Sequence, residues 1–410
     1  MQILNARCAG LDVHKQSVVA CVLVSEGQDK VEKHCQTFGT MTPDILALAD
    51  WLRGLGVKEV AMESTGVYWR PIYQLLEESF QLLVVNAAQV KRMPGRKTDV
   101  TDAEWLAELL QHGLLAASFV PPQAQRELRE LTRHRTNLVE KRTQAVNELH
   151  RTLEGTNLKL SSVATDITGL SAMRMLEALL QGEMTDPNLL AELAVGRLRR
   201  KIPQLQKALQ GRIREHQRLI LSQLLVDIEL FDEQVEQVSG MIEQRLTEQT
   251  QLLARLDAIP GVSRRTVEVV LAELGADMKR FPNARHAAAW AGMCPSNKES
   301  GGRRFAARSR QGNKALKRAL VEAAMAAGRT KETYLSAQYR RIGARRGKKR
   351  AAMAVGHTLL RIIYHMIKEG TTYRDLGADY FDRRNQTAVV RRLVERLEGL
   401  GYTVNVSKAA

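Results

Sequence analysis

Apolar residues in the first third of the chain follow two alternating patterns. Short runs rich in β-branched and small apolar residues are typical of strands, whereas apolar residues recurring every three or four positions are typical of helices. The strand-like runs occupy residues 9–13, 18–24, 34–38, 59–62 and 81–86. The helix-like stretches occupy residues 42–55, 68–78 and 101–110. Only the polar residues 14–17 separate the first two runs, so we predict that these form an antiparallel pair.

The order of these segments predicts a mixed α/β sheet. Three strands come first, and the later strands alternate with helices in the order β-β-β-α-β-α-β-α. This is the element order of the RNase H-like fold. Thr42 and Pro43 are suited to the start of the first helix, with Thr42 as its cap and Pro43 in its first turn.

After Pro121 and Pro122 the pattern becomes helical. One long helix is predicted over residues 123–153 and a second long helical stretch over residues 202–253, which together suggest a coiled-coil or antiparallel arm. Further helices are predicted over residues 264–274, 281–290, 314–327 and 352–367, whereas residues 155–196 are less regular and the tail after residue 370 is not assigned. The turn Ile259-Pro260-Gly261-Val262 before the helix at 264 resembles a helix-hairpin-helix element that holds a DNA phosphate.

We therefore expect four parts in the 410-residue chain. The fold class is α/β plus all-α: a sheet domain at residues 1–120, a helical coiled-coil arm at 121–250, a mainly helical basic domain at 251–370 and a tail at 371–410.

Charge is distributed unevenly over these parts. The chain carries a net charge of +16, yet residues 1–120 hold 11 Lys and Arg against 14 Asp and Glu. Residues 251–370 hold 25 against 8, an excess that indicates a polyanionic partner such as nucleic acid. A merely solubilising surface is the alternative, and a membrane partner is disfavoured because no bulky apolar face accompanies the charges. A basic run is expected to contact nucleic-acid backbone, comprising Arg345, Arg346, Lys348, Lys349 and Arg350.

The sequence favours the cytoplasm. No apolar run approaches the roughly 18–20 residues that span a bilayer, and the N-terminus lacks the layout of a signal peptide. The four cysteines form no C-x-x-C pair, which fits a reducing compartment.

Four carboxylates are expected to converge at one edge of the sheet. Asp12 ends the first strand, Glu63 directly follows the fourth, and Asp99 and Asp102 stand at the entrance of the helix near residue 101. Clustered carboxylates repel one another, and Mg²⁺ or Mn²⁺ removes the conflict while leaving room for phosphate oxygens. Taken singly, each acid could equally be a helix cap or a turn residue.

These segments resemble a known family. The motifs are GLDVHK at 10–15, MESTG at 62–66 and KTDVTDA at 97–103, and together they are similar to the DEDD insertion-sequence transposases, whose relatives include the Piv DNA invertase. Their first domain is similar to the RuvC Holliday-junction resolvase. The resemblance implies that Asp12, Glu63, Asp99 and Asp102 form a metal-binding tetrad.

The basic half also resembles this family, through IPGV at 259–262, AWAGMCP at 289–295 and ESGG at 299–302. The resemblance implies that Ser300 is a catalytic serine. It further implies guidance by a structured non-coding bridge RNA that pairs with donor and target DNA. A composite site is also implied, in which the carboxylates of one subunit serve the serine of another in a homodimer or homotetramer.

The residues around Ser300 suit phosphate chemistry. Glycines allow close approach of a phosphate, and guanidinium groups bind its oxygens in bidentate fashion. The cations near Ser300 are Lys298, Arg303, Arg304, Arg308 and Arg310. The hypothesis is that Ser300 attacks a metal-positioned phosphate and forms a phosphoserine link to DNA. A plain loop serine is the alternative, and Tyr334 or Tyr339 could attack instead, although nothing local favours either.

Two other functions remain open from the residues. A RuvC-like nuclease could use the same carboxylates with water as nucleophile and would form no covalent adduct with DNA. A non-enzymatic nucleic-acid-binding protein is the third reading, and the intact set of four acids argues against it.

Overall fold

The computed structural model of the chain describes residues 2–25, 31–64, 66–90, 93, 101–182, 184–294, 299–304 and 311–407, and for residues 88, 89, 299, 300 and 304 it describes the backbone. The chain forms two compact units, Met1–Pro122 and Gln123–Ala410. Each unit is described by itself. Within the described residues, no helix has both the length and the hydropathy that a membrane crossing requires.

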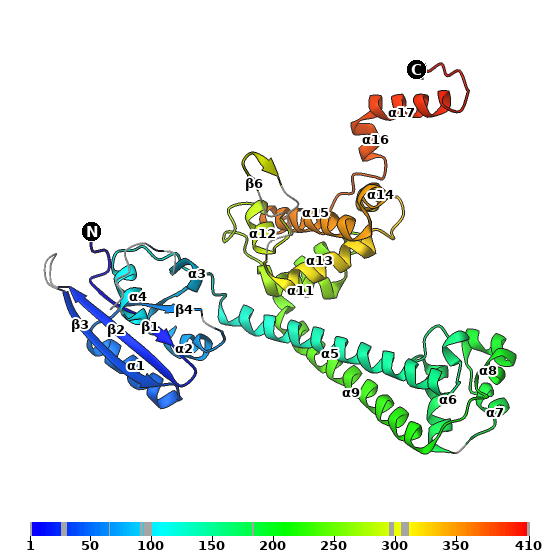
Figure 1. Ribbon diagram of the computed structural model, residues 1–410, viewed down its shortest axis with the longest axis horizontal. Helices are drawn as coiled ribbons and strands as arrows, with labels where there is room; N and C mark the ends of the chain where they lie inside the picture. Colours follow the sequence, from blue (N-terminus) through cyan, green and yellow to red (C-terminus); the bar gives the residue numbers. More distant parts are fainter. Residues whose placement is uncertain are drawn as a thin grey trace. The chain divides into compact units, whose positions relative to one another are not determined.

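The first unit is a five-stranded mixed sheet with helices (Figure 1). Its elements are β1 (Arg7–Val13), β2 (Ser17–Ser25), β3 (Val31–Gly39), α1 (Thr42–Gly54), β4 (Glu59–Glu63), α2 (Trp69–Leu76), β5 (Gln81–Val85), α3 (Ala87–Val90) and α4 (Asp102–Gln111). The strand order is β3-β2-β1-β4-β5. The pairs β1–β2 and β2–β3 are antiparallel, whereas β1–β4 and β4–β5 are parallel. The predicted mixed sheet is confirmed, and its order is compatible with an RNase H-like domain.

Alternation along the strands gives the sheet two buried faces. The residues of one face, which include Leu11 and Met62, pack with the apolar stripes of α1 and α2 in a single cluster. The opposite face carries Cys8 and Ala61, which pack with Ala107 of α4. Each fully buried large apolar side chain contributes roughly 1.5–3 kcal/mol. The apolar side chains of α4 are buried against this second face of the sheet, so packing fixes the position of α4 over the sheet.

The start of α1 differs from the prediction in its cap. The residue at the cap position is Met41 rather than Thr42, and Thr42 is the first helical residue. The Met41 backbone N–H donates to the Asp44 side chain at 3.2 Å, so an acid in the first turn replaces the expected threonine cap. Pro43 lies in the first turn, as predicted.

The described residues of the second unit form helices and one small hairpin. Its elements are α5 (Gln123–Gly155), η1 (Leu160–Ser162), α6 (Leu170–Gln181), α7 (Pro187–Glu192), η2 (Gly196–Lys201), α8 (Ile202–Ala208), α9 (Glu215–Arg245), η3 (Thr247–Gln249), α10 (Thr250–Asp257), α11 (Arg264–Leu274), α12 (Ala284–Trp290), β6 (Glu299–Ser300), β7 (Arg303–Arg304), α13 (Lys314–Ala327), α14 (Tyr334–Arg346), α15 (Lys348–Glu369), α16 (Tyr380–Arg384) and α17 (Gln386–Glu398). The predicted bounds of α11 and α13 are confirmed.

Helices α5 and α9 lie side by side and run in opposite directions (Figure 1). Arg142 on α5 binds Asp232 on α9 through two hydrogen bonds of 2.6 and 2.9 Å, whereas Arg245 near the far end of α9 reaches back to Glu127. The irregular stretch that connects the two long helices contains α6, α7 and α8, which pack in one apolar cluster with the ends of α5 and α9.

The helical stretch predicted over residues 202–253 consists of several separate helices. The chain leaves the helical path between α8 and α9, and again at η3. At the first break Gly211 lies so close to the chain after α5 that an added Cβ would be 2.7 Å from the Thr156 carbonyl oxygen. The Arg212 N–H donates to the same carbonyl at 3.1 Å. A contact between distant segments therefore interrupts a stretch whose local pattern is helical.

In the basic region, residues 251–370, the apolar core is built around α15. Its residues Leu359, Ile363 and Tyr364 are buried, and the Tyr364 hydroxyl donates to the Phe281 carbonyl at 2.8 Å. This helix is longer than predicted, because it begins directly after Gly347 at Lys348. The helix predicted to begin at Phe281 begins at Ala284 instead, since Asn283 accepts hydrogen bonds from two N–H groups of the first turn.

A buried carboxylate joins three helices of this unit. The side chain of Glu273, on α11, is 0% exposed and accepts two hydrogen bonds from Arg133 of α5 at 2.8 and 3.0 Å. Arg129 of α5 lies 3.2 Å from the same carboxylate, and Asn313 before α13 donates to it at 2.6 Å. Burial lowers the pKa of Arg129 to about 10, an effect that the charge of Glu273 opposes.

Replacing Glu273 by alanine is expected to lower the free energy of unfolding by about 3–5 kcal/mol, because it leaves Arg129, whose side chain is only 14% exposed, without its counter-charge. Urea unfolding followed by circular dichroism measures this change. Glu395→Ala is the control, since Glu395 is 63% exposed and pairs with Arg391, which is itself exposed; its loss should stay below about 1 kcal/mol. Equal losses in both variants would contradict the role of Glu273.

Candidate active site

Asp12 and Glu63 lie at the ends of neighbouring parallel strands. The register pairs Gly10 with Ala61 and Leu11 with Met62, so the next step along both strands brings Asp12 beside Glu63. Leu11 and Met62 point into the cluster shared with α1 and α2. Because side chains alternate along a strand, Asp12 and Glu63 face the other side, where α4 packs.

The helix α4 brings Asp102 to the same edge. An added Cβ on Gly10 would be 2.1 Å from the Ala103 carbonyl oxygen, and the Cys8 thiol donates to the Ala107 carbonyl at 3.5 Å. The helix therefore runs against the direction of β1, and its first turn lies over the carboxyl end of that strand. Asp102 is the first residue of α4 and is exposed there. Glycine at position 10 permits this close approach.

Asp99 lies outside the described residues, so the structure brings three of the four predicted acids to one edge. Within the described part of the chain, no group of three or more His, Cys, Asp or Glu side chains is close enough to hold a metal ion. The donor set nevertheless fits Mg²⁺, because it consists of carboxylate oxygens at an open edge of the sheet. The tetrad therefore stays a prediction.

Two interactions at this edge were not anticipated from the sequence. His14, which is 61% exposed, places Nε2 at 3.1 Å from Asp12 Oδ2. Lys33 on β3 binds Glu104 in the first turn of α4 at 2.7 Å, and this hydrogen bond raises the pKa of Lys33. In the first contact His14 lies against a carboxylate oxygen of Asp12, whose side chain is 22% exposed. The second ties the helix that carries Asp102 to the sheet.

Ser300 lies in a two-residue β-hairpin. Its strands β6 and β7 pair Ser300 with Arg303, and the turn consists of Gly301 and Gly302 with φ of 56° and 71°. A turn with positive φ at both central residues favours glycine at each position. Arg303 is therefore the residue that faces Ser300 across the hairpin backbone. Arg303 is exposed.

The chain that carries the hairpin is anchored at both of its ends. Before it, the Met293 N–H donates to the Ala288 carbonyl at 2.9 Å, and after it, the Asn313 N–H donates to the Trp290 carbonyl at 3.2 Å. Gly312 lies against Gly292, since an added Cβ on Gly312 would be 2.3 Å from the Gly292 nitrogen. The serine segment therefore leaves and re-enters the fold at the end of α12. Three of the predicted cations of this segment lie outside the described residues: Lys298, Arg308 and Arg310. For Arg304 only the backbone is described.

The predicted basic run lies at the junction of α14 and α15. Gly347, with φ of 82°, separates the two helices, and all five cations of the run are exposed: Arg345, Arg346, Lys348, Lys349 and Arg350. Such a cluster at a helical corner suits contact with phosphate groups. The alternative nucleophiles Tyr334 and Tyr339 are partly buried against the helical core. Burial is the main cause that raises the pKa of Tyr334, which does not favour an attacking phenolate.

Two segments of the sequence match families of known proteins, one in each half of the chain. Residues 9–158 match the transposase family of the IS110 DEDD type, and residues 253–340 match the transposase family IS116/IS110/IS902. The chain belongs to the IS110 family of DEDD transposases. It is thus a DNA-processing enzyme, and the two matched segments contain both the carboxylates and Ser300.

Individual relatives carry similar descriptions. A probable family 20 transposase of Pseudomonas aeruginosa is 25% identical over 331 residues, which cover 79% of this chain and 88% of the relative. The transposase for insertion sequence element IS1111A of Coxiella burnetii is 26% identical over 68% of this chain and 69% of its own length. An uncharacterised protein of insertion element IS110 from Streptomyces coelicolor is 33% identical over 33% of this chain and 36% of its own length.

Proposed function

We propose that this transposase cuts and rejoins donor and target DNA through a covalent phosphoserine intermediate. The proposal assigns metal binding to Asp12, Glu63, Asp99 and Asp102, and nucleophilic attack to Ser300. The observation that carries it is the placement of Asp12 beside Glu63 under the first turn of α4, within a chain whose family acts in transposition. An RNase H-like fold for the first unit, with its carboxylates at this edge, is part of the proposal.

The carboxylates would hold Mg²⁺ or Mn²⁺, which prefer oxygen ligands and keep sites open for phosphate. When bound, such ions stabilise the charge on the attacking and leaving oxygens of a phosphoryl transfer. The chain supplies the fixed spacing for this. Pairing of β1 with β4 fixes Asp12 beside Glu63. The close contact between Gly10 and Ala103 fixes the position of Asp102 along β1.

Ser300 supplies the nucleophile in this proposal. Its Oγ forms a bond to phosphorus while the bond from phosphorus to the departing strand's oxygen breaks. The hydroxyl proton leaves to solvent, and the departing oxygen takes one up. The phosphoserine conserves the energy of the phosphodiester, so attack by another strand's hydroxyl can rejoin DNA without an external energy source. In this proposal Arg303, which pairs with Ser300 across the hairpin, binds a non-bridging oxygen of the phosphate.

A structured guide RNA from the same element is the second nucleic-acid partner in the proposal. Two cationic regions are available for two polyanions, the serine segment with its arginines and the corner between α14 and α15. Contacts of the five cations at that corner with RNA phosphates would make RNA affinity fall with salt, by a slope of roughly 0.7–0.9 per phosphate neutralised.

The helical arm supports an oligomer, which a composite site requires. Leu219, Val226, Leu230 and Met241 on α9 are each between 45% and 62% exposed. With about 100° per residue they form one stripe, on the side of α9 opposite to the buried residues that face α5. These exposed apolar side chains share their face with the exposed polar residues Gln223 and Gln237, and they suit pairing with a second copy of the chain.

Replacing Val226 and Leu230 together by glutamate is expected to dissociate the oligomer while leaving the monomer folded, because both side chains are already exposed. Mass photometry measures the assembly and circular dichroism the fold. The control is Leu170→Glu with Leu189→Glu, two equally exposed residues on α6 and α7 of the same arm. Retention of the assembly by the stripe variant would show that α9 does not mediate it.

A covalent-adduct assay tests the proposed function. The purified chain, RNA transcribed from the DNA flanking its gene, Mg²⁺, and labelled donor and target DNA are combined, then denatured. A protein–DNA species that survives denaturation and disappears with EDTA is expected. Cleavage without any such species would instead establish the alternative function, a RuvC-like nuclease that hydrolyses structured DNA with water. In that case Ser300 would have no catalytic role and would be a plain loop serine.

A further inference from the structure

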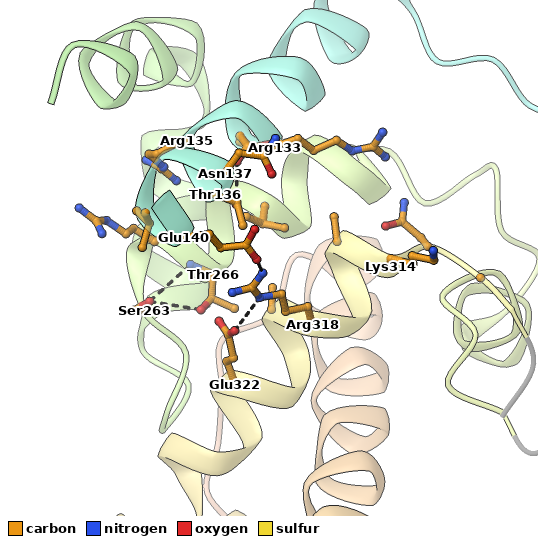
Figure 2. A pocket seen from close by; sticks show the side chains of 18 residues that line it. Arg133, Arg135, Thr136, Asn137, Glu140, Ser263, Thr266, Lys314, Arg318 and Glu322 are labelled. Atoms are coloured by element: carbon orange, nitrogen blue, oxygen red, sulfur yellow. Dashed lines mark hydrogen bonds and ion pairs between the residues drawn. The ribbon is translucent and has the colours of Figure 1, made fainter. Parts of the chain in front are cut away.

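A second feature of the basic unit lies apart from the serine hairpin. Helices α5, α11 and α13 enclose a cavity of about 920 Å³ (Figure 2). Its lining includes residues 132–140 of α5, the first turn of α11 and the first turn of α13. Such a volume is in the range of small-ligand sites and is ample for one nucleotide. The function proposed above does not use it.

The cavity has an ion-paired cluster at its centre and polar or basic residues at its two rims. In its centre Arg318 of α13 lies between Glu140 and Glu322, and it pairs with both carboxylates (Figure 2). Ser263 and Thr266 of α11 lie to one side of Arg318, and Lys314 of α13 lies to the other. The centre therefore repels an anion, whereas each rim can attract one.

The rim cations are not neutralised. Arg265 is the second residue of α11, and Lys314 opens α13; both line the cavity and both are exposed. In the described part of the chain neither forms an ion pair, unlike Arg133 and Arg135, which are held by Glu273 and Glu268. The first turns of α11 and α13 also contain no acidic residue, so the positive end of each helix dipole is uncompensated.

The two rims are rigid. Gly261 packs the turn before α11 against α13, since an added Cβ would be 2.3 Å from the Ala327 nitrogen. At the other rim, Asn313 caps α13 through the Leu316 N–H at 3.0 Å and is itself fixed by the buried Glu273. Both cations are therefore carried on helix starts whose positions are set by the core, and a bound phosphate requires little reorganisation.

The geometry points to a DNA-strand site: the cavity receives one nucleotide, with a phosphate on Arg265 at one rim and another on Lys314 at the opposite rim. The sugar and base then face the central Arg318 cluster, whose carboxylates can accept hydrogen bonds from base amino groups. DNA rather than RNA is favoured because Asn313, at the Lys314 rim, is also where the serine segment re-enters the fold. That choice rests on the proposed role of Ser300.

DNA affinity in a Ser300→Ala background tests the site independently of strand cleavage. The probes are a labelled 20-nucleotide single strand of mixed sequence and an RNA of the same sequence, titrated over a range of salt by fluorescence anisotropy. Arg265→Ala with Lys314→Ala is expected to reduce the salt slope for DNA by about 1.4, at roughly 0.7 per phosphate on a single strand, which corresponds to about a 25-fold loss of affinity at 0.1 M salt.

The matched control removes two charges elsewhere. Arg174 and Lys331 are exposed, lie outside the cavity and have no ion pair in the described part of the chain. Their double alanine variant should keep the slope of the parent protein. A third variant, Ala315→Trp, fills the cavity without changing its charge and should weaken DNA binding without altering unfolding by urea.

The salt slopes of these variants distinguish a specific DNA site from a general effect of charge and from an RNA site. An unchanged DNA slope in the Arg265/Lys314 variant overturns the site, as does an equal loss in the control, which would show a general effect of net charge. A loss for RNA alone overturns the choice of DNA. Because the background carries no serine nucleophile, none of these results depends on the covalent adduct, whose absence in the earlier assay would count against the proposed function only.

Discussion

Replacing Ser300 by alanine is expected to abolish the covalent protein–DNA adduct and to reduce strand transfer by about 1000-fold or more. The reason is chemical, since alanine has no hydroxyl with which to form the ester to phosphorus. The hairpin should persist, because its turn depends on Gly301 and Gly302 and not on the serine side chain. Denaturing gels with end-labelled donor DNA measure the adduct, and sequencing of joined products measures strand transfer.

Ser309→Ala provides the comparison, because it makes the same substitution in the same basic segment. That variant should retain adduct formation. Binding of guide RNA should be unchanged in both variants, which separates loss of chemistry from loss of assembly. Recombination that survives in Ser300→Ala would exclude this serine as the nucleophile.

Replacing Asp12 or Asp102 by asparagine is expected to lower strand transfer by about 1000-fold, which corresponds to the several kcal/mol that metal-stabilised charge contributes to phosphoryl transfer. Each amide keeps the shape of the side chain and removes its charge. Binding of Mn²⁺, measured by calorimetry, should weaken in parallel. Mn²⁺ should also raise the unfolding temperature of the parent protein, since it binds the folded state, and it should raise that of the variants less.

Asp50→Asn removes an acid from the same unit without touching the proposed tetrad. Asp50 is 75% exposed on α1 and pairs with Arg53. It should leave metal binding and strand transfer unchanged. If the Asp12 and Asp102 variants bound Mn²⁺ like the parent protein, the carboxylates at this sheet edge would not be the metal ligands.

Local signals explain which helices could be predicted from the sequence. The predicted bounds of α11 and α13 agree with local signals that the structure shows, since Ser263 and Asn313 cap these helices through their side chains and Gly275 ends the first. The break before α9 was missed because it depends on contact between Gly211 and Thr156, which no local pattern reports. The α1 cap was misplaced by one residue, since Thr42 and Met41 compete and the Asp44 side chain favours Met41.

The sequence predicted the part of the candidate site that depends on the order of the strands. Asp12 and Glu63 follow from the β1–β4 pairing, which the element order implies. The tight contact between Gly10 and α4 follows from packing, and so does the cavity beside Arg318. Glu273 was not singled out because a glutamate in an amphipathic helix is usually exposed, and only the fold shows its three partners.

The separation of the carboxylates along the chain has a consequence during synthesis. Asp12 and Glu63 acquire their spacing when β4 pairs with β1, but Asp102 joins them only after α4 has packed on the sheet through Ala103 and Ala107. A ribosome must therefore release the whole first unit before the proposed metal site can form. Translation that stops before α4 would therefore yield a fragment without the proposed metal site.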